Sequence, residues 1–209
     1  MRLHQEILLC LGATFCVAIG ICLYTDCQLG ADSITVFLDG MNKTTGLSIS
    51  LIDQMLVIIM FISAYFINKH NIGICTIIHT VTIGILIMFA SLFITPLELT
   101  KQSLFVRCLG VLLAELCFCF GFASMQKLSS GMATADAFIY GIVEKTHLSY
   151  IKIHFIFDSV YFIIGYLLGG IIGIGSIVYV LTSGWITFQI KKRIRSEEHT
   201  SELQSPLPI

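Results

Sequence analysis

The stretch Thr45-Gly46-Leu47-Ser48 recurs 101 residues later as Thr146-His147-Leu148-Ser149, and this repetition decides the fold. The same offset places Leu29-Gly30 on Ser130-Gly131 and Gly40 on Gly141. After a slip of one residue, Ile72–Thr76 matches Ile172–Ser176 and Gly84 matches Gly184. Two similar hydrophobic halves in one chain are typical of membrane transporters, so the repetition predicts a duplicated membrane protein.

The composition predicts a polytopic membrane protein. Of the 209 residues, 56% are hydrophobic and 12% are charged, and the mean hydropathy is +0.90. These values exclude a soluble domain and a disordered chain. The apolar run that begins at Ile7 continues to Tyr24 without a small-residue cleavage site. We therefore expect a first membrane helix there rather than a signal peptide.

The segment Arg195–Ser205 resembles the in-frame translation of a common sequencing adapter. We therefore expect residues 195–209 to be a non-native read-through tail, and we exclude them from the fold. The rest of the chain then divides into a first membrane repeat over residues 1–100 and a second over residues 101–194.

Six apolar runs are long enough to cross a bilayer, which takes about 20 helical residues. They are Ile7–Tyr24, Leu47–Ile67, Ile72–Ile94, Phe105–Met125, Ile151–Leu168 and Ile171–Ile190, with a tight hairpin expected at Gly169-Gly170. The sequence thus predicts an all-α membrane fold with three spanning helices in each half.

Basic residues predict the orientation, because they accumulate on the cytoplasmic side of a membrane. With the N-terminus inside, the inner side holds Arg2, Lys69, Lys127, Lys145, Lys152, Lys191, Lys192 and Arg193, and the outer side holds Lys43, Lys101 and Arg107. We therefore expect both termini in the cytoplasm. Because three spans is an odd number, the second half enters the membrane from the opposite side, and the repeats are predicted to be inverted.

Each half also contains a shorter helical segment after its first span, Asp32–Lys43 and Asp136–Lys145. Apolar residues follow a helical stripe in both: Ile34, Phe37, Leu38 and Met41, then Ala135, Phe138, Ile139 and Ile142. The expected start signals are Asp32 or Ser33 for the first helix, and Thr134 with Asp136 in its first turn for the second. Gly46 can end the first.

At about a dozen residues, these amphipathic helices are too short to span a membrane. They either lie flat in the membrane interface or enter the membrane as re-entrant half-helices. In the second arrangement, their N-terminal amides would point to a shared site near the midplane.

Three motifs follow one another along the chain in a characteristic order. They are Leu29-Gly30-x-Asp32, then Lys43-x-x-Gly46-Leu47-Ser48, then Gly169-Gly170-x-x-Gly173-x-Gly175-Ser176 followed by Gly184. This order resembles the YczE/YyaS/YitT group of bacterial membrane proteins, and within it the YczE-like branch. The group often has proline after the loop glycine, where this chain has Ser33 and Ala135. The resemblance extends from Leu8 to Ile190 and implies a multi-pass protein of the bacterial inner membrane, without assigning catalytic or binding residues.

Charged side chains inside a bilayer cost a few kcal/mol each, so those that occur there are candidates for function. They are Asp53, His79, Glu115, His154 and Asp158. One interpretation is a proton relay, with Glu115 the strongest candidate because it lies near the middle of its span. The other is a set of satisfied hydrogen bonds between helices. His154 and Asp158 are one helical turn apart and can pair.

Other features predict structure rather than chemistry. The cysteines lie mostly in apolar runs without a CxxC pair, so we expect small buried hydrophobes rather than disulfides or a metal site. Gly165-x-x-x-Gly169-x-x-x-Gly173 is a ridge that packs helices within the subunit or, alternatively, in a homodimer. No nucleotide-binding, protease or hydrolase motif occurs, so we expect no enzyme, cofactor, metal or nucleic-acid partner.

The sequence leaves two functions open. The first is a secondary transporter or permease for an unknown small solute, coupled to protons if the buried acids exchange them. The alternative is a non-transporting scaffold or regulatory partner of another enzyme complex. A transporter requires an internal cavity that its acids face, whereas a scaffold requires a filled core.

Overall fold

A computed structural model describes residues 3–128 and 130–203, and the side chains of these residues except 184, 188 and 191–203. No strand occurs in this part of the chain. Six helices are long: α1 (Leu3–Cys27), α3 (Ile49–Asn68), α4 (Ile74–Ile94), α5 (Leu104–Met125), α7 (Tyr150–Leu167) and α8 (Ile174–Leu203). Two are short, α2 (Ser33–Thr45) and α6 (Thr134–Thr146), and three 3-10 turns lie in connections, η1 (Lys69–Asn71), η2 (Thr95–Leu97) and η3 (Leu99–Lys101).

The exterior and the helix lengths are those of a membrane protein. Among the described residues, five helical segments are long and apolar enough to cross a membrane: Leu3–Cys27, Ile49–Asn71, Ile74–Lys101, Leu104–Met125 and Tyr150–Leu167. The described apolar part of α8, Ile174–Ser183, is shorter. Phe66, Ile151 and Leu167 are 79%, 78% and 77% exposed. Apolar surface of this extent is stable against lipid, so the chain is a multi-pass membrane protein.

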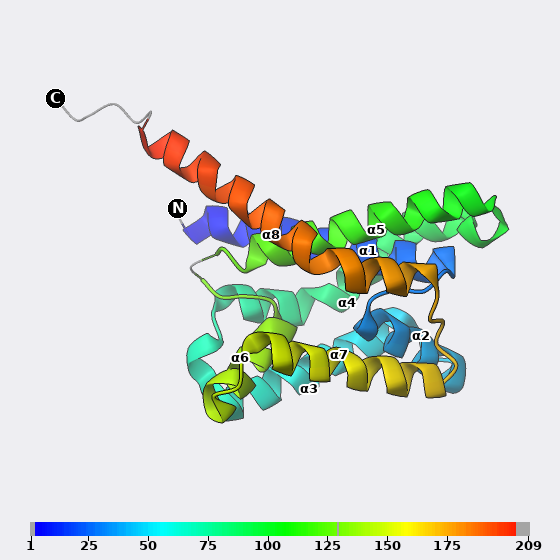
Figure 1. Cartoon of the computed structure of the whole chain (residues 1–209), viewed down its shortest axis with the longest axis horizontal. Helices are drawn as coiled ribbons and strands as arrows, with labels where there is room; N and C mark the ends of the chain where they lie inside the picture. The colour runs from blue at the N-terminus through cyan, green and yellow to red at the C-terminus, as the bar shows by residue number, and fades with distance from the viewer. Residues whose placement is uncertain (1–2, 129, 204–209) are drawn as a thin grey trace.

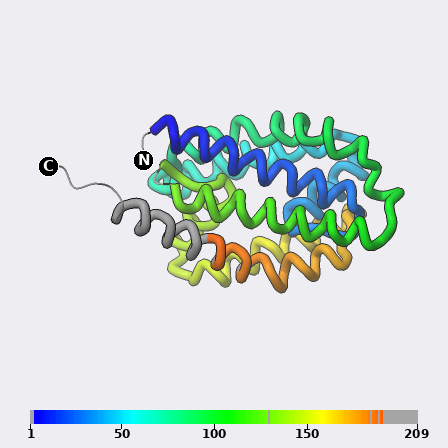
Figure 2. Tube along the Cα trace, turned by 90° about the horizontal axis from the view of Figure 1, so that it is seen from above, coloured from blue at the N-terminus to red at the C-terminus, as the bar shows by residue number. Residues whose placement is uncertain are grey.

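The helices form two layers (Figure 1). One layer contains α4, α1, α5 and α8 in this spatial order, as Figure 2 shows from above. In the other layer, α2 packs along α7, and α6 packs along α3. The short helix α6 lies at the end of the molecule that holds the N-terminus, and α2 lies at the opposite end.

The connection between α7 and α8 is not the tight hairpin that we expected at Gly169-Gly170. It runs from one layer to the other, and α8 packs on α5 instead of on α7 (Figure 1). Within the glycine ridge, Gly165 lets α7 approach α2 closely, because a Cβ atom there would lie 2.7 Å from the backbone nitrogen of Phe37 on α2.

The short helices begin and end largely as their sequences predict. Asp32 is the N-cap of α2, and its Oδ2 accepts a hydrogen bond from the backbone N–H of Thr35 at 3.2 Å. Gly46 ends α2 in the left-handed region, with φ +72°. In the second half, Ala133 rather than Thr134 is the N-cap, and Thr134 is the first helical residue.

The loop after α1 and the loop after α5 make matching contacts across the two halves. The carbonyl of Leu29 accepts a hydrogen bond from the N–H of Gly175 at 2.8 Å. At the equivalent positions, the carbonyl of Ser130 accepts one from the N–H of Cys75 at 3.0 Å. Each half therefore binds the first turn of the other half's last helix through its own loop.

A second pair of bonds strengthens the same contacts. The hydroxyl of Ser176 accepts from the N–H of Ala31 at 3.1 Å, and the equivalent hydroxyl of Thr76 donates to the carbonyl of Met132 at 2.8 Å. Glycine is needed at both loops. Gly30 and Gly131 have φ +92° and +118°, and a Cβ atom on Gly131 would lie 2.8 Å from the Cα atom of Gly73.

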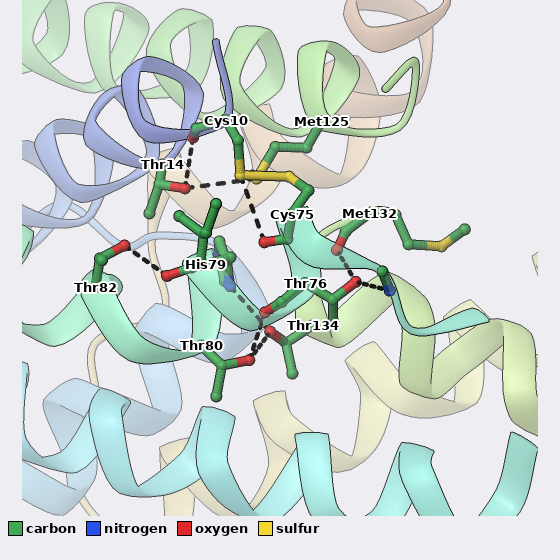
Figure 3. Close-up of a disulfide and its surroundings, with 12 residues drawn as sticks. Cys10, Thr14, Cys75, Thr76, His79, Thr80, Thr82, Met125, Met132 and Thr134 are labelled. Atoms are coloured by element: carbon green, nitrogen blue, oxygen red, sulfur yellow. Dashed lines mark hydrogen bonds between the residues drawn. A yellow bond between two sulfur atoms is a disulfide. The ribbon is translucent and has the colours of Figure 1, made fainter. Parts of the chain in front are cut away.

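A disulfide links Cys10 on α1 to Cys75 on α4, with Cα atoms 5.8 Å apart (Figure 3). Our expectation that the cysteines are only small buried hydrophobes is therefore wrong for this pair. The pairing depends on the packing of α1 along α4, which brings together residues 65 positions apart. The remaining cysteines are free.

Candidate functional site

A cavity of about 30 Å³ lies where the two short helices begin. The first turn of α2 contributes Asp32, Ile34 and Thr35, and the first turn of α6 contributes Ala135. The long helices α3 and α4 add Asp53 and His79. A cavity of this volume has room for about two water molecules.

Four residues of the cavity wall have buried polar atoms without a hydrogen-bond partner among the described residues. These atoms are Asp32 Oδ1, Thr35 Oγ1, Asp53 Oδ2 and His79 Nε2. The side chains are inaccessible from outside, because Asp32 is 1% exposed and Asp53 and His79 are each 3% exposed. An unpartnered buried polar atom costs about 1–3 kcal/mol, so four around one cavity indicate a place that water or a polar ligand fills.

The tautomer of His79 follows from a chain of hydrogen bonds (Figure 3). The hydroxyl of Thr80 donates to the carbonyl of Thr76 at 2.7 Å. Because a hydroxyl has one proton, Thr80 Oγ1 must accept from Thr134 Oγ1, which lies 2.7 Å away. Thr134 Oγ1 then accepts from His79 Nδ1–H at 3.0 Å. In a neutral ring, the unpartnered Nε2 therefore carries a lone pair and is an acceptor.

The rest of the cavity wall is apolar. It includes aliphatic side chains of α1, α3 and α4 and the rings of Phe118 and Phe122, whose centroids are 4.7 Å apart. No lysine or arginine is among the described residues that line it. The site thus presents carboxyl groups, a hydroxyl and an imidazole at one place in an otherwise apolar pocket.

Glu115 is buried elsewhere, between α1, α5 and α8. The hydroxyl of Tyr24 donates to its Oε2, and the thiol of Cys119 donates to its Oε1 at 3.3 Å. Thr182 of α8 lies 3.5 Å from the same oxygen. The carboxyl group therefore joins three helices and has partners for both oxygens. It does not line the cavity.

Asp158 and His154 pair on α7, as their spacing predicts. His154 Nδ1 lies 3.0 Å from Asp158 Oδ2. The other oxygen of Asp158 accepts from the hydroxyl of Ser33 at 2.5 Å. Since Ser33 follows Asp32 in the chain, this pair reaches the start of α2 directly beside the cavity.

Asp136 in the first turn of α6 does not reach the cavity either. Its Oδ2 accepts from the amide of Gln126 at 2.6 Å, and its Oδ1 accepts from the hydroxyl of Tyr150 at 3.0 Å. This carboxylate therefore ties the start of α6 to α7 and to the end of α5.

The structure thus brings together Asp32, Asp53 and His79 from the sequence-predicted set, and it adds residues that the sequence did not single out. One of these is Thr35, which lines the cavity, and its position one turn after the cap residue Asp32 is a signal that could have found it. Tyr24 and Thr80 gave no such signal. Among the described residues, no group of three histidine, cysteine or acidic side chains is placed to hold a metal ion.

Comparison with known proteins gives a family and a distant relative. An uncharacterized protein of Haemophilus influenzae is 24% identical over 116 residues, which are 56% of this chain and 51% of that protein. The match thus spans about half the length of the relative. No solved structure matches. Residues 3–192 match a family of unknown function, DUF6198, and the chain belongs to this family.

Proposed function

We propose that this chain is a secondary transporter for a small solute, built from two inverted repeats in the inner membrane of a bacterium with both termini in the cytoplasm. We further propose that DUF6198 is related to the YczE-like membrane proteins that the sequence resembles. In this arrangement, α2 and α6 are re-entrant half-helices that enter the membrane from opposite sides and meet at the cavity.

The matching contacts of the two halves support the inverted arrangement. In one bond, Leu29 of the first half accepts from Gly175 of the second half. In the other bond, the equivalent residues exchange halves, and Ser130 of the second half accepts from Cys75 of the first. An exchange of this kind is what a two-fold axis between the halves produces. The placement of α2 and α6 at opposite ends of the molecule is in keeping with an axis in the membrane plane.

The observation that carries the transport proposal is the set of unpartnered polar atoms around the cavity. A scaffold gains nothing from buried carboxyl oxygens without a protein partner, because each destabilises the fold. A transporter requires such groups, because they must release one ligand and accept another during its cycle. Asp53, Asp32 and His79 are the proposed binding and coupling residues, and Asp158 with His154 is a second proton-exchanging pair beside them.

The alternative function, a non-transporting scaffold or regulatory partner, is favoured by one observation. The cavity, at about 30 Å³, is too small for a solute larger than a few heavy atoms. A transporter of a larger solute must therefore widen the cavity by moving the layers apart, whereas a scaffold needs no second conformation.

Proteoliposomes test the proposal. The purified full chain is reconstituted with a pH-sensitive dye in the lumen, and amines, amino acids, sugars and inorganic ions are added outside in turn. Transport predicts that one class of solute changes the lumenal pH, and that Asp53→Asn abolishes the change. The matched control is Glu98→Gln, since Glu98 is an exposed carboxylate that is paired with Lys101 and does not line the cavity. If every class of solute gave the same dye signal in liposomes with and without the protein, the result would favour the scaffold.

A further inference from the structure

We propose that the cavity bounded by Asp32, Thr35, Asp53 and His79 binds a small primary ammonium ion, with methylammonium as the simplest example. Binding itself requires no transport. That this cation is the transported solute rests on the proposed function.

The charge of the cavity wall selects a cation. Asp32 and Asp53 each present an unpartnered carboxyl oxygen, and no lysine or arginine lines the described wall. A buried carboxylate is stable only when an opposite charge or a proton compensates it. An anion would leave that charge without compensation, and a neutral sugar would require both carboxyl groups to be protonated.

The hydrogen-bonding groups select an ammonium ion among the cations. Asp32 Oδ1, Asp53 Oδ2 and His79 Nε2 are three acceptors, because the bond to Thr134 takes the proton of the ring to Nδ1. A primary ammonium group carries N–H donors, and acceptors are the groups that this wall leaves unpartnered. Thr35 adds a hydroxyl that can accept or donate.

The remaining wall argues against a metal ion. Hard metal cations require a shell of oxygen ligands, whereas most of this wall is aliphatic or aromatic. An alkylammonium ion suits such a wall, because its methyl group contacts apolar side chains and its charge is attracted to aromatic rings such as Phe118 and Phe122.

The size of the cavity limits the ligand. A volume of about 30 Å³ has room for one or two heavy atoms inside the cavity, which is the size of ammonium or methylammonium. Longer amines require the cavity to open.

Equilibrium binding of radiolabelled methylammonium to the purified full chain in detergent tests the inference. We expect saturable binding that ammonium chloride displaces and sodium chloride at equal ionic strength does not. Asp32→Asn and Asp53→Asn should each weaken binding about tenfold or more, because each loses a charge-assisted hydrogen bond. Asn is as good an N-cap as Asp, so Asp32→Asn keeps the start of α2 and remains informative if Asp53→Asn fails to fold. Glu98→Gln should bind as the wild type does.

The two proposals fail in different ways. Absence of saturable binding, equal displacement by sodium, or full binding by the folded Asp32→Asn variant would overturn the ammonium site. Methylammonium binding without any solute-dependent proton movement in liposomes would leave the site standing and overturn transport. Proton movement with another solute class, together with no methylammonium binding, would overturn the ammonium site and leave transport standing.

Discussion

His79 on α4 and Thr134 at the start of α6 are joined by a hydrogen bond of 3.0 Å between Nδ1 and Oγ1. This bond crosses from the first half of the chain to the second and lies beside the cavity. It fixes the ring orientation and presents Nε2 as an acceptor. A single threonine hydroxyl thus connects the position of a short helix to the chemistry of the site.

Removing that hydroxyl should destabilise the protein and disturb the ring. Thr134→Val leaves His79 Nδ1–H without its acceptor, and it removes the donor to Thr80. We expect the free energy of unfolding to fall by about 1–2 kcal/mol in a detergent unfolding titration. Nitrogen-15 spectra of the histidine should show protonated Nδ1 in the wild type and a mixture of tautomers in the variant. Thr134→Ser keeps the hydroxyl and should match the wild type in both measurements.

Glu115 should prove structural rather than coupling. Glu115→Gln keeps an acceptor for the hydroxyl of Tyr24, so the variant should fold and retain solute-driven proton movement. Tyr24→Phe leaves the carboxyl oxygen unpartnered and should lower stability by about 1–2 kcal/mol. Loss of proton movement in a well-folded Glu115→Gln protein would instead identify Glu115 as the coupling acid.

The sequence predicted elements that depend on local patterns. The helical stripe from Ile34 to Met41 and its copy in the second half located α2 and α6, and Gly46 marked the end of α2. These features follow from side-chain spacing and backbone freedom, which are properties of adjacent residues.

Contacts between distant helices could not be predicted in the same way. The disulfide, the partners of Glu115 and the grouping of Asp53 with His79 all depend on which helix faces pack together. Burial depth along a span indicated that Glu115 is costly, but it did not indicate that Tyr24 lies opposite. The crossing connection after α7 was missed because Gly169-Gly170 permits a tight turn as readily as a change of layer.

The disulfide predicts a specific labelling pattern. In protein purified without reductant and then denatured, a maleimide should modify every cysteine except Cys10 and Cys75, and those two should react after reduction. Reduction should also lower the melting temperature. The entropy of closing a loop between residues 65 positions apart sets an upper limit of about 4 kcal/mol on the stability lost. The double variant Cys10→Ala/Cys75→Ala should melt at the same temperature with and without reductant. Labelling of both residues before reduction would contradict the bond.

The C-terminal segment should contribute little to the fold. The family match ends at residue 192, and the adapter-like segment begins at Arg195. Deleting residues 195–209 should therefore leave expression and melting temperature within experimental error of the full chain. A fall of several degrees would mean that the tail packs on the membrane domain.

The orientation of the two short helices gives the sharpest test of the inverted arrangement. Thr45 and Thr146 are equivalent, exposed residues at the ends of α2 and α6. The basic residues predict that Thr45 faces the outside and Thr146 the cytoplasm. Single cysteines are introduced at these positions into a background that lacks the six free cysteines and keeps the Cys10–Cys75 disulfide, which does not react with maleimides.

In intact spheroplasts, an impermeant maleimide should label Thr45→Cys at once and Thr146→Cys only after the membrane is permeabilised. The background protein without an added cysteine is the control and should stay unlabelled in both conditions. Labelling of both positions from outside would place α2 and α6 on one side of the membrane. An axis in the membrane plane exchanges the two sides, so equivalent residues on the same side are incompatible with it.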